Sequence, residues 1–143
     1  MKKILVINPG STSTKIAVYN DEKEILVNTI RHSMDELAKF PRIIDQFEFR
    51  KELVLKTLEE NSIPFQFDAI VGRGGLLKPI PGGVYEVNDA MLNDIMHAMR
   101  THACNLGCLL ASELKYGQMK IKFQKLMVRD CLRMIILMRI KTS

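Results

Sequence analysis

The segment ILVINPGSTSTKIAV, residues 4–18, decides the fold predicted for this chain. Its first four residues are apolar and form the short continuous run that is typical of a fully buried strand. Asn8, Pro9 and Gly10 interrupt this run, because proline has no amide for a sheet hydrogen bond and glycine tolerates a positive φ. The segment therefore predicts a strand, a turn and a second strand.

The turn is rich in hydroxyl groups, which indicates a site for an anion. Residues 11–14 read Ser-Thr-Ser-Thr, and Lys15 follows them. A tight turn directs several amides and hydroxyls at one point, and an ammonium group beside them adds positive potential, so the turn is suited to phosphate oxygens. An ordinary turn between two strands is the alternative interpretation. The segment lacks the Gly-x-x-x-x-Gly-Lys-Ser/Thr pattern and is neither a P-loop nor a Rossmann fingerprint.

The composition predicts one globular domain. The chain has 143 residues, of which 47% are hydrophobic and 26% are charged. It has no run of 18 uncharged apolar residues, and the apolar run near Met1 is too short for a signal peptide. Three cysteines without a disulfide framework agree with a reducing compartment. We therefore expect a cytoplasmic protein that does not enter a membrane.

The positive net charge of +5 belongs to the carboxyl-terminal segment. Residues 1–113 hold 13 basic and 15 acidic side chains, whereas residues 114–143 hold eight basic side chains and Asp130 as their one acid. Phe123 is the one aromatic residue of residues 118–143. Nucleic acid binding is not expected, because single strands are held by basic grooves interleaved with aromatic residues.

Further along the chain, the pattern predicts an α/β domain. Residues 24–31 alternate as a third strand, and Ser33 with Glu36 forms a capping box for a helix that starts near Met34. An amphipathic helix is expected over residues 42–61, and a buried strand over 67–71. A brief strand over 84–87 and a helix from Asn88 or Asp89 to about Arg100 follow.

Residues 72–83 contain five glycines and two prolines, and we expect a shaped loop there. Glycine lets the backbone approach a ligand closely, and the planar fork of Arg73 suits a carboxylate or a phosphate. A surface loop with a solvated arginine is the alternative.

At residues 101–107, a helix that begins with Thr101 as its cap is one interpretation. Cys104 and Cys108, four residues apart, are expected to be buried apolar residues and not zinc ligands.

Three segments together resemble one family. The string NPGSTSTK at residues 8–15 resembles the first phosphate loop of acetate and butyrate kinases, and Pro9 favours the butyrate branch. The string VGRGGLLKPIPGG at residues 71–83 is similar to butyrate kinases almost letter for letter. The string THACNLG at residues 101–107 resembles a His-Ala-Ser-Asn-Leu-Gly segment of the same family, with Cys104 in place of serine. The resemblance covers residues 1–117.

This resemblance implies a fold and an activity. The fold would be a ribonuclease-H-like half domain of the actin-like ATPase kind, with a mixed sheet flanked by helices. The activity would be that of a butyrate kinase, which converts ATP and butanoate to ADP and butanoyl phosphate with Mg²⁺. Isobutyrate is a further expected substrate, because a pocket rejects an extra methylene by only about 1 to 3 kcal/mol. Full-length relatives are expected to be homo-oligomeric.

The resemblance also assigns roles to individual residues. Arg73 and Asn8 are expected to be catalytic, and Asn8 also to help place Mg²⁺. The expected ATP-binding residues are Asn8, Ser11, Thr12, Ser13 and Lys15. The expected substrate-binding residues are Arg73, Gly74, Gly75, His102 and Asn105.

The resemblance stops near Gly117, which divides the chain into an incomplete kinase domain, residues 1–117, and a basic tail, residues 118–143. A frameshift near residue 118 explains the change in composition. The alternative is a genuine basic helix with Met127, Cys131, Met134 and Met138 along one stripe. The family's catalytic aspartate, adenosine pocket, second arginine and metal-binding glutamate would lie beyond this point. We therefore expect the 143-residue chain to be inactive alone, and a non-catalytic phosphate-binding or interaction module is the alternative function.

Overall fold

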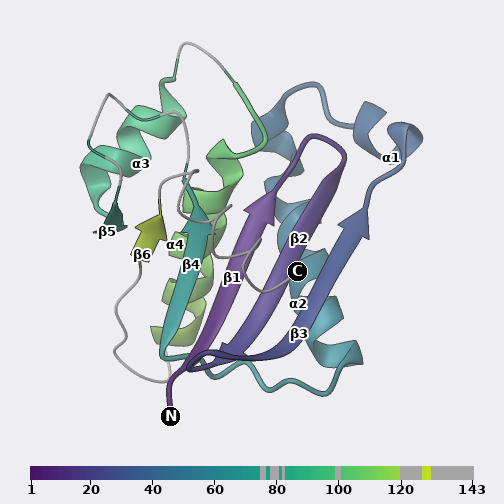
Figure 1. Ribbon diagram of the computed structural model, residues 1–143. Helices are drawn as coiled ribbons and strands as arrows, with labels where there is room; N and C mark the ends of the chain where they lie inside the picture. The colour runs from purple at the N-terminus through teal and green to yellow at the C-terminus, as the bar shows by residue number, and fades with distance from the viewer. Residues whose placement is uncertain (75–76, 78–80, 82, 99–100, 120–126, 130–143) are drawn as a thin grey trace.

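The computed structural model describes residues 1–74, 77, 81, 83–98, 101–119 and 127–129. These residues form a six-stranded mixed sheet with the strand order β3-β2-β1-β4-β6-β5 (Figure 1). The strands are β1 (Lys3–Pro9), β2 (Ser13–Asn20), β3 (Lys23–Arg31), β4 (Ala69–Arg73), β5 (Val84–Glu86) and β6 (Met127–Arg129). Strands β1, β2 and β3 form an antiparallel meander, whereas β4 lies parallel to β1 and β6 lies parallel to β4.

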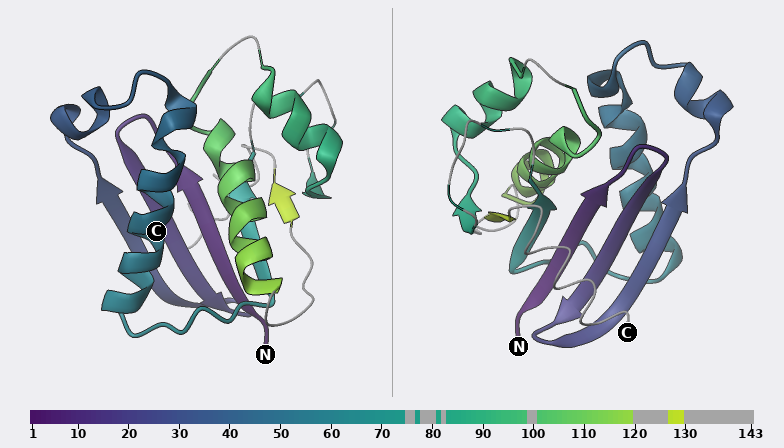
Figure 2. Two further views of the ribbon diagram at one scale, coloured as in Figure 1. Left: turned by 180° about the vertical axis from the view of Figure 1, so that it is seen from behind. Right: turned by 45° about the horizontal axis from the view of Figure 1, so that its top comes forward.

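The helices connect and cover this sheet. They are α1 (Met34–Ala38), the 3₁₀ turn η1 (Ile43–Gln46), α2 (Phe47–Glu60), α3 (Asp89–Met96) and α4 (Asn105–Met119). Seen from behind, α2 and α4 lie side by side across one face of the sheet (Figure 2). The predicted capping box of α1 is confirmed, since the Ser33 side chain accepts from the Glu36 amide and the Glu36 carboxylate accepts from the Ser33 amide.

The hydrophobic core lies between the sheet and these two helices. Alternate residues of the strands point toward the helices, among them Leu5 and Ile7 of β1 and Ile16 of β2, all fully buried. The helices pack against these strand residues with apolar side chains at a spacing of four. Those of α4 are Leu106, Leu110 and Leu114, and those of α2 are Val54 and Leu58. The opposite residues of each strand, which include Asn8 and Lys15, therefore lie on the other face of the sheet.

Several boundaries differ from the expected ones. Strand β1 continues through Pro9, and the turn follows at residues 10–12. Gly10 does not use a positive φ, and the described residues with one are Asp21 and Ser62. Because the first turn after Pro41 is 3₁₀, the expected helix 42–61 is divided into η1 and α2.

The second half of the chain also departs from the expected boundaries. Gly72 and Arg73 belong to strand β4, so the glycine-rich loop begins after them. Helix α3 ends at Met96 and not near residue 100. Helix α4 begins at Asn105, where a turn closed by a bond from the Asn105 amide to the His102 carbonyl precedes it. The prediction that Thr101 caps this helix is therefore wrong.

The described part of the carboxyl-terminal segment is β6 together with the end of α4. Helix α4 crosses the expected boundary at residue 117, and β6 pairs with β4 through Val71 and Met127. Met127 is thus in a strand, so the helical stripe is wrong at this residue, and Cys131, Met134 and Met138 lie outside the described residues. The frameshift stays a prediction.

No helix within the described ranges is long and apolar enough to cross a membrane.

Candidate functional site

The hydroxyl-rich turn lies at one end of the sheet, where β1 ends and β2 begins (Figure 1). The Gly10 amide donates to the Ser13 carbonyl over 2.7 Å and closes the turn. Ser11 and Thr12 are exposed, and Ser13 is half-buried. Ser11, Thr12 and Ser13, three of the predicted phosphate-binding residues, are therefore gathered in a tight, accessible bend.

Three of the predicted site residues lie in a row beside this turn. Asn8 is registered with Lys15 on the neighbouring strand β2. On its other side, β1 pairs with β4 so that Ile7 lies opposite Gly72, which places Asn8 beside Arg73. Arg73 Nη1 donates to Asn8 Oδ1 over 3.3 Å. Partners across adjacent strands share a face, so Lys15, Asn8 and Arg73 form one polar line on the face opposite the core.

Arg73 still has hydrogen-bonding capacity at this site. Its Nε is buried and has no hydrogen-bond partner among the described residues. A buried donor without a partner costs about 1 to 3 kcal/mol, so such groups in native structures need an explanation. A planar guanidinium with an unused N–H is suited to a carboxylate or phosphate oxygen.

The backbone of Arg73 is held by direct contact with helix α4. A Cβ on Gly72 would overlap the Gly107 carbonyl, and a Cβ on Gly107 would overlap the Arg73 carbonyl. Only two glycines allow the strand and the helix to approach this closely. The contact fixes the end of β4, and with it the position from which the Arg73 side chain leaves the sheet.

Arg50 of α2 supports the turn from the core side and was not predicted from the sequence. Its side chain is fully buried, and its guanidinium donates to the carbonyls of Ser13 (3.0 Å) and Ser11 (3.5 Å). It also donates to Thr14 Oγ1 (3.2 Å) and to Gln46 Oε1 from Nε (3.1 Å) and Nη2 (2.8 Å). Burial lowers the pKa of Arg50 to about 10, which leaves it charged at neutral pH.

His32 is the second unpredicted support of the turn. Its amide donates to the Thr12 carbonyl over 2.8 Å, and its Nε2 lies 2.8 Å from Thr14 Oγ1. The ring packs edge-on against Phe49 and is buried, and its Nδ1 has no hydrogen-bond partner within the described part of the chain. Burial, and next the charge of Arg50, lower the pKa of His32, while Glu36 opposes the shift. The imidazole is therefore neutral at neutral pH.

The remaining predicted site residues lie after strand β4 and at the start of helix α4. His102 Nδ1 accepts from the Cys104 amide over 3.1 Å, which makes it part of the turn before α4. Asn105 lines a cavity of about 370 Å³ together with residues of the η1 and α3 regions, among them Ile44 and Ile95. Gly74 directly follows β4, and Gly75 lies outside the described residues.

Cys104 and Cys108 are buried, as predicted, and burial raises the pKa of Cys108 to about 12. No three His, Cys, Asp or Glu side chains within the described ranges are grouped to hold a metal ion. Asn8 Oδ1 accepts from the Arg73 guanidinium, and the role of Asn8 in placing Mg²⁺ stays a prediction.

The chain is similar in sequence to two curated proteins. The chain is 70% identical over 112 residues to a probable butyrate kinase of Bacteroides thetaiotaomicron, covering 78% of this chain and 32% of that protein. A probable butyrate kinase of Phocaeicola vulgatus is 52% identical over 112 residues, with the same coverage. The resemblance to butyrate kinases is thus confirmed. The chain spans about a third of the length of the curated relatives it matches.

A solved structure supports the fold. The acetate kinase of Porphyromonas gingivalis has a TM-score of 0.55 at 13% identity, over 91% of this chain and 37% of that one. The predicted fold, a ribonuclease-H-like half domain with a mixed sheet flanked by helices, is confirmed. No family model matches the chain.

Proposed function

We propose that this chain supplies one side of the active site of an ATP-dependent carboxylate kinase that acts on butyrate. The observation that carries the proposal is the polar line of Lys15, Asn8 and Arg73 beside the hydroxyl-rich turn. The similarity to two probable butyrate kinases supports the choice of substrate.

In this proposal the turn and the polar line bind different parts of the reacting molecules. The amides and hydroxyls of Ser11, Thr12 and Ser13, with Lys15, hold the phosphates of ATP. Arg73, whose Nε–H has no partner among the described residues, holds the carboxylate of the acid or the phosphoryl group during transfer. A carboxylate oxygen attacks the γ-phosphorus, the bond from that phosphorus to the bridging oxygen breaks, and ADP leaves with the electron pair. Catalysis of this kind consists mainly of positioning and charge stabilisation.

Mg²⁺ would be held mainly by the triphosphate, since the described residues offer no cluster of metal ligands. The acid is placed at the Arg73 end of the polar line, and Gly74 beside it allows close approach of a ligand to the backbone. A role of His102 and Asn105 at the acyl end, and of Gly75 beside Arg73, is proposed on the resemblance alone.

The strength of the site depends on how much water is excluded. A lysine and a phosphate oxygen about 4 Å apart interact by roughly 4 kcal/mol near a protein surface, and by about 1 kcal/mol in bulk water. The described residues line one side only, with Ser11 and Thr12 exposed. We therefore propose that the 143-residue chain binds phosphate weakly and does not turn over by itself.

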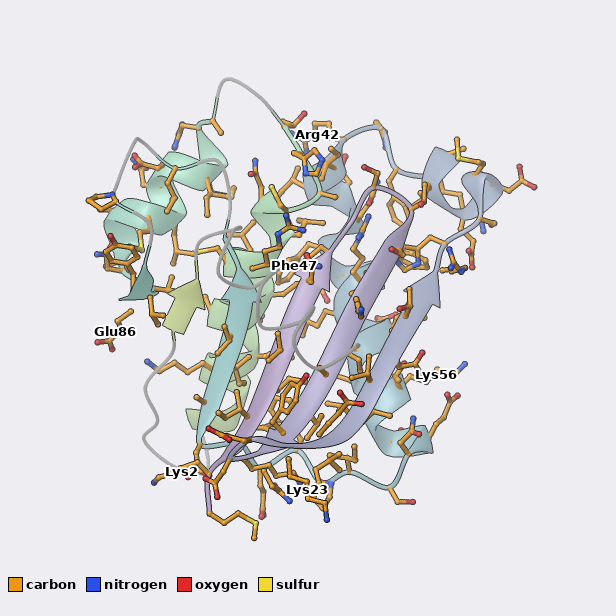
Figure 3. The ribbon with its side chains drawn as sticks, in the orientation of Figure 1. Lys2, Lys23, Arg42, Phe47, Lys56 and Glu86 are labelled. Atoms are coloured by element: carbon orange, nitrogen blue, oxygen red, sulfur yellow. The ribbon has the colours of Figure 1, made fainter. Side chains whose placement is uncertain are left out.

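A chimera tests the proposed activity. The matched 112 residues would replace their counterparts in the Bacteroides thetaiotaomicron protein, and butyryl phosphate would be measured as its hydroxamate. We expect turnover, and a loss of kcat of about 10²-fold or more on Arg73→Ala, as for removal of a positioned donor at an oxyanion. Lys23→Met, at the opposite end of the sheet (Figure 3), is the matched control and should leave kcat unchanged. An active chimera that is indifferent to Arg73 would contradict the proposal.

A further inference from the structure

Arg50 carries a positive charge that has no counter-ion within the described part of the molecule. It is fully buried, no described carboxylate forms an ion pair with it, and burial is the cause of its lowered pKa. A buried charge without a partner is expensive, and hydrogen bonds to neutral oxygens offset this cost only in part. An anion bound nearby would therefore balance the charge of Arg50 within the described part of the molecule.

The hydrogen bonds of Arg50 point to where that anion would lie. All of its bonds to the turn end on oxygens: the carbonyls of Ser11 and Ser13 and the hydroxyl of Thr14. The carbonyl of Thr12 accepts from the His32 amide. The carbonyls of residues 11–13 are thus each engaged from within the protein.

The backbone N–H donors of the turn remain available on its outer side. Within the described residues the amides of Ser11 and Thr12 donate no hydrogen bond, and both residues are exposed. When carbonyls are held from below, the amides of a tight turn converge on the other side, where they form a concave site for an anion. A charge directly beneath such a turn adds to its potential, because little water separates the two.

We propose that Arg50 is a positioning residue of the phosphate site, and that a phosphate group bound on the outer side of the turn is its counter-ion. This inference rests on the proposed function, since it assigns a support to the same turn. Arg50 acts through the backbone of residues 11–13, which it holds in the binding conformation, and through its charge. It does not touch the ligand.

Binding of inorganic tripolyphosphate to the 143-residue chain, measured by calorimetry, tests this role. We expect Arg50→Gln, which keeps a side-chain donor but removes the charge, to weaken binding at least about tenfold. Arg50→Lys keeps the charge and should stay within about threefold of the unsubstituted chain. Between low and high KCl, the affinity of the Arg50→Gln chain should fall less than that of the other two. A purely structural role would lower affinity without changing the salt dependence.

Arg42 provides the matched control. It lies at the same end of the molecule as the turn (Figure 3), but it is exposed and already paired with Asp45 at 2.9 Å. Because an exposed, paired charge contributes little, Arg42→Gln should change tripolyphosphate affinity less than about twofold. An equal loss for Arg42→Gln and Arg50→Gln would overturn the proposal, since the effect would then follow net charge alone.

A measurement on the unsubstituted chain keeps the proposal testable if Arg50→Gln fails to fold. The Arg50 Nε–H is buried and bonded to Gln46, so its ¹⁵N resonance should be visible and should shift when tripolyphosphate binds, whereas that of Arg42 should not. Binding that shifts the amides of residues 11–13 but not Arg50 overturns the Arg50 role only. Absence of any binding overturns both this role and the phosphate site of the proposed function. If tripolyphosphate binding depends on Arg50 but the chimera is inactive, the positioning role of Arg50 is supported and the proposed kinase activity is rejected.

Discussion

Gly72 of β4 and Gly107 of α4 touch backbone to backbone, and neither position has room for a Cβ atom. The contact brings the first turn of α4 against the strand that carries Arg73. It also explains how a helix can lie so close to the sheet at this point, because any larger residue would push the two apart. The geometry at Arg73 therefore depends on two residues that have no side chain.

Gly107→Ala should destabilise the chain by about 1 to 3 kcal/mol, because its methyl group would overlap the Arg73 carbonyl, which is backbone and cannot turn away. Urea unfolding followed by circular dichroism measures the loss. Gly10→Ala is the control, since a Cβ there would lie 3.4 Å from its nearest neighbours, and it should cost less than about 0.5 kcal/mol. Equal stability of the two variants would show that α4 is not packed in this way.

Stability should fall as the pH is lowered, through His32. Its pKa is below the ordinary value of 6.5 in the folded chain, so the unfolded chain binds the proton more readily. The stabilisation is fully present above about pH 6.5 and is lost as the pH falls toward the folded pKa, at up to about 1.4 kcal/mol per pH unit. Urea unfolding between pH 8 and pH 5 measures it. His32→Gln should reduce the slope, and an unchanged slope would exclude His32 as its source.

Cys108 should be unreactive in the folded chain. Its thiol is fully buried, and burial raises its pKa to about 12, so almost no thiolate is present near neutral pH. Iodoacetamide labelling followed by peptide mass spectrometry should find this residue unmodified in buffer and alkylated in concentrated urea. Rapid alkylation without denaturant would mean that α4 opens readily or packs differently.

The 143-residue chain alone should form no measurable butyryl phosphate from ATP and butyrate. Each tenfold of rate enhancement requires about 1.4 kcal/mol of transition-state stabilisation, and a kinase combines many such contributions. The described site offers Lys15, Arg73 and the turn, on a chain about a third as long as its relatives. An assay coupled to ADP release checks this, with the active chimera as the positive control. Turnover by the purified chain would refute the prediction.

Much of the fold could be predicted from the sequence because periodicity reports which face of an element is buried. The three opening strands, the α1 capping box and the strand after the long helix all follow from local pattern. The division of residues 42–61 could not be predicted, because a 3₁₀ turn and an α-helix have similar apolar spacing over four residues. The start of α4 was missed since the turn from His102 to Asn105 has no distinctive local signal.

The candidate site was predicted in part. The proximity of Asn8 and Arg73 depends on the parallel pairing of β1 with β4, which only the resemblance implied. Arg50 and His32 were missed because a charged or polar residue in an amphipathic segment is normally exposed. One signal was available for Arg50: it lies four residues before Val54 and eight before Leu58, on the buried stripe of α2.

The central claim is that the turn after β1 and the guanidinium on β4 bind the two substrates of one reaction. The turn binds the phosphates of ATP, and Arg73 binds the carboxylate of the acid. An NMR titration of the ¹⁵N-labelled chain tests it most directly. Tripolyphosphate should shift the amides of residues 11–13, and butyrate added next should shift the Arg73 Nε–H, which has no partner in the described structure. Shifts confined to the opposite end of the sheet, around Lys2 and Lys23 (Figure 3), would contradict the account.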